Sequence, residues 1–217
     1  MNKVTNIVRT TYLKNRFFII TVTLFAIIWA VLYMTSIDRK DWWIENILVF
    51  GFFLSIFFAQ RKFIFSDISL IFLFIFLSLH IYGAQGAYTQ NQLGEWLRSE
   101  LHLSRNPYDR IVHFSFGFLL AYPIMDLFNF FGKTSKTLIL NSNMAILCLA
   151  TVFELIEWGV AAFTDAATGE TYVATQGDPW DAQKDIILAI IGSLLFTFIY
   201  NIFRRSKSIV PNCATVK

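Results

Sequence analysis

Charged residues are scarce in this sequence. Asp, Glu, Lys and Arg make up only 15% of its 217 residues, whereas a soluble domain usually carries about 25%. The formal net charge of +3 is too small to make a phosphate-binding surface, so nucleic acid is not expected as a partner. Hydrophobic residues make up 56% of the chain, and 24 residues are Phe. This composition excludes an ordinary soluble domain and a disordered chain, and it favours a small protein with several membrane spans.

Cysteine is almost absent, and the familiar catalytic motifs are missing. Cys148 falls inside an apolar run and Cys213 in a polar tail, so we expect no disulfide. The sequence contains no phosphate-binding loop, no Cys-x-x-Cys pair, no nucleophile elbow and no dinucleotide fingerprint. Any chemistry must therefore come from residues outside these motifs.

Apolar runs of spanning length predict an all-α, polytopic membrane protein with a bundle of six transmembrane helices. A helical span takes roughly 20 apolar residues, and the runs lack the period-two alternation of a barrel. The first span is expected to stay as a signal anchor, because it is longer than a cleaved signal peptide and no Ala-x-Ala site follows it. Residues 1–217 are expected to form a single integral-membrane domain. The six expected spans are approximately 17–34, 45–59, 63–82, 107–131, 138–163 and 179–203.

The loop between the third and fourth spans has apolar residues at helical spacing. These residues are Leu93, Trp96, Leu97 and Leu101. They are compatible with a short helix lying on the membrane surface and equally with a packed loop.

Positive charge is distributed unevenly between the two sides of the bundle. Twelve of the 18 Lys and Arg residues lie in the two tails and in the loops after the second and fourth spans. Such an excess marks the cytoplasmic side, so both termini are expected in the cytoplasm. Thirteen of the 15 acidic residues and all three histidines fall on the outward side. Because acids contribute little to topology, this cluster indicates a cation, or a substrate with cationic groups, as the partner.

Three segments bring ionisable residues to the same membrane depth, where such residues are costly and usually functional. Residues 106–113, Asn-Pro-Tyr-Asp-Arg-Ile-Val-His, start the fourth span and place Asp109 and His113 on one helix face. Glu154 and Glu157 share a face inside the fifth span. The segment that leads into the sixth span places three further acids on one face: Asp178, Asp181 and Asp185.

Helix capping explains part of this pattern. Asn106 and Asp178 are good N-caps, and each precedes a Pro that suits the first helical turn. Asp109 and Asp181 suit the positive end of a helix dipole. Capping does not explain the residues that lie deeper in the helices, which are His113, Glu154, Glu157 and Asp185.

Three interpretations of the deeper residues remain open. One imidazole with several carboxylates suits a divalent cation such as Mn²⁺, Fe²⁺, Mg²⁺ or Zn²⁺ held between helices. In that interpretation, Glu157 would act as a general base and Arg110 would hold an anionic group. Alternatively, the carboxylates handle protons, or the residues form buried ion pairs that fix helix register. The candidate metal ligands are His113, Glu154, Asp181 and Asp185.

Other polar and small residues have simpler interpretations. Asp126 is expected to be interfacial, and His80 is expected to pack at an interface rather than to join the acidic cluster. Gly117, Gly159 and Gly192 are expected to allow close approach of helices.

Three motifs stand out in the sequence: Asp109-Arg110-x-x-His113-Phe114, Phe153-Glu154-x-x-Glu157-Trp158 and Gln176-Gly177-Asp178-x-Trp180-Asp181-x-x-x-Asp185. Together they resemble the YjdF-like family of bacterial inner-membrane proteins, a domain of unknown function. The resemblance covers nearly the whole chain, from the first span through the sixth, and implies this location and fold but no reaction. The starts of the fourth and sixth spans are also similar to VanZ-like envelope proteins, which are associated with glycopeptide resistance, but that activity is not carried over.

The sequence therefore predicts a multi-pass inner-membrane protein with an outward-opening acidic pocket between the fourth, fifth and sixth spans. We expect this pocket to bind a divalent cation and to act on a lipid or envelope-linked substrate. The alternatives are a cation- or proton-coupled transporter and a non-catalytic membrane scaffold. A transporter needs a polar path that continues inward past Glu154, and the sequence offers little for it beyond Asn143. Whether the protein is an enzyme is left open.

Overall fold

The protein is a bundle of long helices. The structure, a computed structural model, describes residues 16–59, 62–132, 135–164, 169, 173 and 175–206. Within these residues, six helices are long and apolar enough to cross a membrane, which confirms the predicted all-α membrane bundle. They are α2 (Arg16–Thr35), α3 (Arg39–Ala59), α4 (Asp67–Gln85), α6 (Tyr108–Phe130), α7 (Ser135–Phe163) and α9 (Asp181–Ser206).

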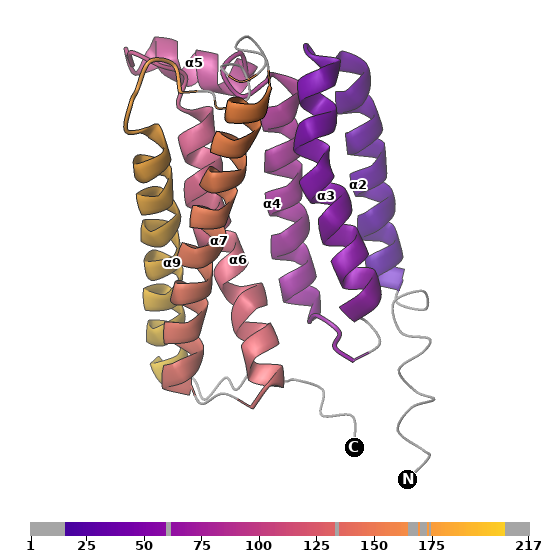
Figure 1. The fold of residues 1–217 in the computed structure, drawn as a ribbon. Helices are drawn as coiled ribbons and strands as arrows, with labels where there is room; N and C mark the ends of the chain where they lie inside the picture. Colours follow the sequence, from indigo (N-terminus) through magenta and orange to yellow (C-terminus); the bar gives the residue numbers. More distant parts are fainter. Residues whose placement is uncertain are drawn as a thin grey trace.

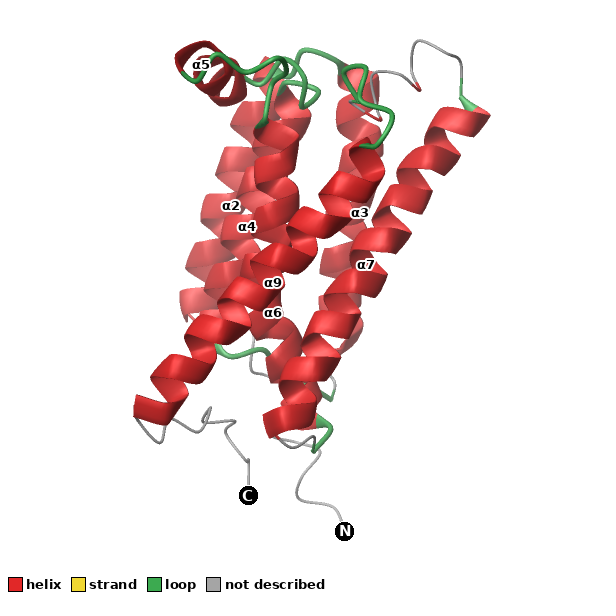
Figure 2. Cartoon of the chain, turned by 90° about the vertical axis from the view of Figure 1, so that its left-hand side faces the viewer, coloured by secondary structure: helices red, strands yellow, loops and turns green. Residues whose placement is uncertain are grey.

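Helix α6 is the centre of the bundle. It packs against α4 on one side and against α7 and α9 on the other, while α2 and α3 pack on α4 (Figure 1). The short helix α5 (Gln92–Glu100) lies across one end of the long helices (Figure 2). Helix α2 begins and α9 ends at the opposite end (Figure 1). The end that carries α5 is called the α5 end below.

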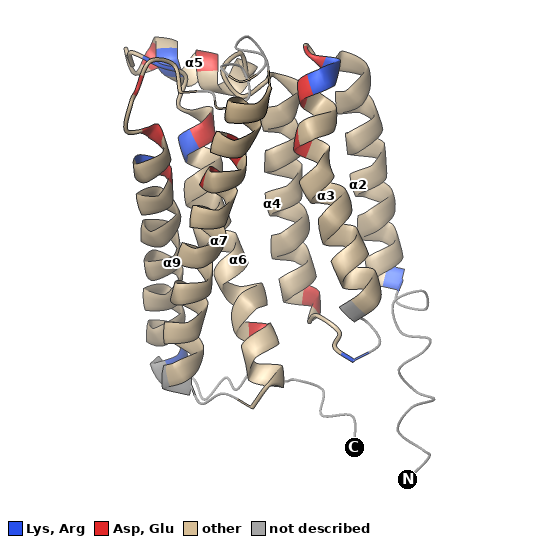
Figure 3. Ribbon diagram, in the orientation of Figure 1, with Lys and Arg blue, Asp and Glu red and all other residues tan. Residues whose placement is uncertain are grey.

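Acidic residues gather at the α5 end, and few lie at the opposite end (Figure 3). This agrees with the uneven distribution of acids in the sequence. Much of the positive charge used to predict orientation lies outside the described residues, as does one of the two cysteines. The residues concerned are Lys3, Arg9, Lys14, Arg61, Lys133, Lys207, Lys217 and Cys213.

Helix α3 begins at Arg39 rather than near residue 45, so the predicted start was wrong. The side chain of Asp38 caps the helix, because its Oδ1 accepts hydrogen bonds from the backbone N–H groups of Lys40 at 2.7 Å and Asp41 at 3.1 Å. The earlier start places Asp41 and Glu45 inside the helix, where both side chains are buried. An acid that the sequence placed at a helix start therefore lies in the interior of the bundle.

The segment before the fourth span forms a helix, as the first of the two alternatives expected, and its position on the membrane surface stays a prediction. Asn91 caps α5 by accepting a hydrogen bond from the backbone N–H of Gly94 at 3.2 Å. The side chains of Leu93, Trp96 and Leu101 remain exposed on this helix or directly after it.

Two glycines bring α6 and α9 into backbone contact. A Cβ atom at Gly117 would overlap the carbonyl oxygen of Ala189, and one at Gly192 would overlap the carbonyl oxygen of Phe114. The prediction of close helix approach is confirmed at both positions. It was wrong for Gly159, where a Cβ atom would meet no described atom within 4 Å. The contact between α6 and α9 sets the distance between the polar residues that these helices carry.

Asp126 joins α6 to the start of α4 at the end opposite α5. Its side chain is buried, and its Oδ2 accepts hydrogen bonds from the backbone N–H of Ser66 at 2.9 Å and the hydroxyl of Ser69 at 2.8 Å. This carboxylate therefore satisfies donors at the start of another helix, and its position at the membrane interface stays a prediction.

Candidate functional site

The loops before α6 and α9 have the same local structure and are tied to each other. Asn106 Oδ1 accepts a hydrogen bond from the backbone N–H of Tyr108 at 3.0 Å, and Asp178 Oδ1 accepts one from Trp180 at 3.1 Å. Each side chain thus forms an Asx turn directly before its helix, and Pro107 rather than the expected Asn106 is the N-cap residue of α6. The backbone N–H of Asn106 donates to the Gln176 side chain at 2.9 Å, and that side chain donates back to the Asn106 carbonyl at 3.1 Å. The two helices therefore start at the same level.

Arg105, which was not among the predicted site residues, links α6 to α9 at the α5 end. Its guanidinium contacts both carboxylate oxygens of Asp181, through Nη1 to Oδ1 and through Nη2 to Oδ2 at 3.3 Å. The same Nη2 lies 3.7 Å from Asp109 Oδ2. All three side chains are 10% exposed or less. Asp181 is therefore engaged in a buried ion pair with Arg105.

Arg110 forms a second ion pair, closer to the surface. Its Nη2 donates to Asp178 Oδ2 at 2.6 Å, and Lys184 Nζ donates to the same oxygen at 2.5 Å. The hydrogen bonds from Lys184, the Trp180 backbone N–H and Arg110 lower the pKa of Asp178 to about 2. Arg110 is thus engaged with an acid at the rim of the site.

Asp109, His113 and Asp185 meet beneath these ion pairs. Each offers a ligand atom, all of these atoms lie within 4.8 Å of one another, and all three residues are buried. His113 Nε2 lies 3.5 Å from Asp109 Oδ1 and 3.5 Å from Glu154 Oε1. Asp185 Oδ1 is buried with no hydrogen-bond partner among the described residues. A buried carboxylate oxygen in this state is unfavourable unless something else binds it.

Glu157 is buried on the face of α7 that carries Glu154. It is near enough to Asp109 and Asp185 to interact with both electrostatically. The structure thus places all six residues of the predicted site at the α5 end. Four lie in or beside the buried cluster, namely His113, Glu154, Glu157 and Asp185, and two lie in the ion pairs above it, namely Asp181 and Arg110.

A second polar group faces the cluster from α3 and α4. His80 Nε2 lies 3.3 Å from the Glu45 carbonyl oxygen and 3.7 Å from Glu45 Oε2. The Tyr88 hydroxyl lies 2.7 Å from His80 Nδ1. Burial raises the pKa of Tyr88 well above its ordinary value, so the phenol keeps its proton. The expectation for His80 is corrected, because this residue is buried and hydrogen-bonded rather than packed at an interface.

Several residues of this arrangement were absent from the predicted site, among them Asp109, Glu45 and Arg105. Asp109 had a signal, since it lies four residues before His113, but it was assigned to helix capping. Glu45 had one too, since it lies four residues after Asp41 within an apolar run. Arg105 lies in a loop before the helix, and no local pattern connects it with its distant partner.

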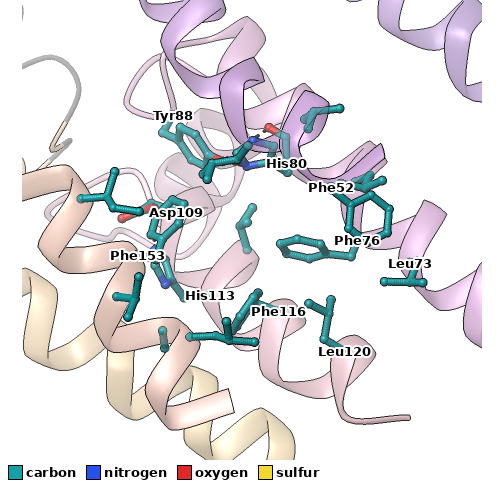
Figure 4. A pocket seen from close by; sticks show the side chains of 18 residues that line it. Phe52, Leu73, Phe76, His80, Tyr88, Asp109, His113, Phe116, Leu120 and Phe153 are labelled. Carbon is teal, nitrogen blue, oxygen red and sulfur yellow. Dashed lines mark hydrogen bonds and ion pairs between the residues drawn. The ribbon is translucent and has the colours of Figure 1, made fainter. Parts of the chain in front are cut away.

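An apolar cavity of about 300 Å³ lies between α3, α4, α6 and α7. Its polar lining residues lie toward the α5 end, where His80 and Tyr88 face Asp109 and His113 across the space (Figure 4). The remaining lining side chains are apolar, and they include Phe52, Leu73, Phe76, Phe116, Leu120 and Phe153. The cavity therefore has one polar end and an apolar body.

These features define a polytopic helical membrane protein with a buried carboxylate–histidine cluster. The chain belongs to the family described as "Predicted membrane protein (DUF2238)", whose model matches residues 17–206. It is similar to the protein named "Inner membrane protein YjdF" of Escherichia coli (strain K12), with 30% identity over 124 residues. The match covers 56% of this chain and 59% of that relative's length. The resemblance to a YjdF-like family is thereby confirmed, and no solved structure matches the chain.

Proposed function

We propose that this protein binds a divalent cation at Asp109, His113 and Asp185 and acts there on a lipid or envelope-linked substrate. The observation that carries the proposal is the convergence of these three buried side chains, one of which has a carboxylate oxygen without a hydrogen-bond partner in the described chain. A cation would satisfy that oxygen and offset the repulsion among the acids.

The donor set decides which ions fit. Two carboxylates and one imidazole, with Glu154 beside the imidazole, form an oxygen-rich set that suits Mn²⁺, Fe²⁺, Mg²⁺ or Zn²⁺. Helical bundles build comparable sites from acids and histidines on facing helices. The proposal replaces Asp181 with Asp109 among the candidate ligands, because Asp181 is held by Arg105.

The remaining residues have roles that follow from their positions. A bound cation would supply Lewis-acid polarisation of a substrate oxygen. Glu157 lies buried near the cluster and is the candidate general base. Arg110 lies at the rim and would exchange part of its contact with Asp178 for an anionic group of the substrate.

Location and orientation are also part of the proposal. One relative of this chain is named an inner-membrane protein, and we assign the same membrane here. The excess of Lys and Arg in the tails and in two loops favours a cytoplasmic position for both termini. The α5 end, with its acids, would then face outward.

A non-catalytic scaffold is the second candidate function. It is favoured by one observation, the buried ion pair between Arg105 and Asp181, which joins the loop before α6 to the start of α9. In a scaffold, the cluster beneath would serve only to fix the register of the helices.

Metal content separates the two candidates. The full chain, purified in detergent and reloaded in turn with Mn²⁺, Zn²⁺ and Mg²⁺, would be analysed by elemental mass spectrometry and for thermal stability. Asp185→Asn, which is nearly isosteric, and His113→Ala are the test variants. Glu100→Gln, at an exposed acid of α5, is the matched control.

We expect close to one ion per chain in the wild type and in Glu100→Gln, and loss of the ion in both test variants. Folded wild-type protein that takes up no ion after reloading would overturn the proposal and favour the scaffold. So would an ion that both test variants retain.

A further inference from the structure

The apolar cavity extends from the carboxylate–histidine cluster along α6, away from the residues proposed to bind a cation. On α6 its lining runs from Asp109 to Leu120, which is about 16 Å along the helix axis at roughly 1.5 Å per residue. Its volume of about 300 Å³ is at the low end of pockets that hold small molecules. A small volume drawn out over this length fits a thin, extended molecule.

The walls of the cavity select the chemistry of that molecule. Away from the α5 end, the side chains that line it on all four helices are aliphatic or aromatic. Water in such a space would lack the two to four polar partners that a buried water needs, and an ion would be less favourable still. A hydrocarbon chain is the occupant that these walls match.

The wall formed by α7 gives access from the side. Leu149, Val152 and Ile156 line the cavity and are themselves exposed. Helix α7 packs on α6 and α9, whereas α3, which forms part of the opposite wall, packs on α4. Because these helices span the membrane, a side opening between α3 and α7 faces the lipid chains.

We propose that the cavity binds one hydrocarbon chain of a membrane lipid, with the polar head of the lipid at the end formed by His80, Tyr88, Asp109 and His113. This inference deepens the proposed function, because it identifies the substrate class as an amphiphile whose head reaches the cation-binding residues. Only the contact of the lipid head with the cation-binding residues rests on the proposed function. Binding of the chain depends on the apolar walls alone.

Photo-crosslinking in a bilayer tests the inference. The full chain would be reconstituted in vesicles of phosphatidylethanolamine and phosphatidylglycerol containing a phosphatidylglycerol with a diazirine midway along one acyl chain. We expect cross-links at Phe116 and Phe153. Val152→Trp, which fills the opening, should reduce them several-fold. Val31→Trp is the matched control, because Val31 on α2 is 55% exposed, compared with 51% for Val152, and does not line the cavity.

Competition identifies the type of chain. An unlabelled phospholipid and an unlabelled isoprenyl phosphate would each be added, and displacement of the label by either one supports chain binding. Cross-links confined to outward side chains such as Leu24, and unchanged by Val152→Trp, would overturn the inference.

Asp185→Asn makes the two proposals separable. In this variant we expect the cross-links in the cavity to persist while the bound ion is lost. Wild-type protein that binds metal but shows no label in the cavity would overturn the lipid inference alone. Label in the cavity of a wild-type protein without metal would overturn the cation proposal alone.

Discussion

Adding a single methyl group at Gly117 should push α6 away from α9. The Cβ atom of an alanine there would overlap the carbonyl oxygen of Ala189. That atom belongs to the backbone, so it can move only if the whole helix shifts. Overpacking of this kind costs typically about 1–3 kcal/mol, and we take the upper end because the backbone cannot yield locally. Removal of a helical glycine returns at most about 1 kcal/mol. The net expectation for Gly117→Ala is a loss of about 2 kcal/mol.

Gly159→Ala is the matched control, since the same change is made within a long helix where no described atom would be met within 4 Å. It should keep the gain in helix propensity and stabilise the protein by up to about 1 kcal/mol. For a chain of this size, each kcal/mol shifts the unfolding midpoint by roughly 2–4 °C. Thermal unfolding in one detergent should therefore place Gly117→Ala several degrees below the wild type and Gly159→Ala at or slightly above it.

The result also bears on the site. Helix α6 carries Asp109 and His113, and α9 carries Asp185, so a wider separation of the helices should weaken binding at the cluster. If Gly117→Ala melts at or above the wild type, the close contact of α6 with α9 is refuted. If both alanine variants lose the same stability, the effect comes from the loss of a glycine and not from the helix contact.

Two further predictions concern the ion pairs at the α5 end. Arg105→Met should destabilise the protein by about 3–5 kcal/mol, because it leaves buried acids without their partner. Adding Asp181→Asn should recover part of that loss. If a double-mutant cycle, measured by thermal or denaturant unfolding, gives no coupling energy between Arg105 and Asp181, the ion pair is contradicted. The pKa of Asp178 is lowered from 3.8 to about 2. Its contact with Lys184 therefore stabilises the fold fully above about pH 4, and this stabilisation is lost as the pH falls through about 2. The gap in unfolding midpoint between wild type and Asp178→Asn should therefore close on acidification, and a gap independent of pH would refute this assignment.

The sequence predicted the parts of the site that lie on one helix. Asp109 and His113 share a face of α6 because they are four residues apart, and the same rule pairs Glu154 with Glu157 on α7. Such periodicity is local, so it is readable without the fold. The meeting of Asp185 with the other helices is not local, since it depends on how closely α6 and α9 cross.

Arg105 and Glu45 were not predicted as site residues, for two different reasons. Arg105 and Asp181 are 76 residues apart in the chain, and their pairing follows from loop geometry that no sequence pattern encodes. Glu45 was missed for a simpler reason. The start of α3 was placed at this residue, and a buried acid in the helix interior was therefore interpreted as an acid at its end.

The placement of polar groups along the helices disfavours a polar transport path that crosses the whole bundle. In the half away from α5, Asn143 accepts a hydrogen bond from Ser193 at 2.5 Å and donates one to Thr197 at 3.4 Å, so its amide is already engaged within the bundle. The cavity ends there among apolar side chains such as Leu73 and Leu120. An ion that left the cluster in this direction would meet no further acid among the described residues that line the cavity. Because burying an unpaired charge is strongly unfavourable, a cation held at the cluster should not continue toward the opposite end of the bundle.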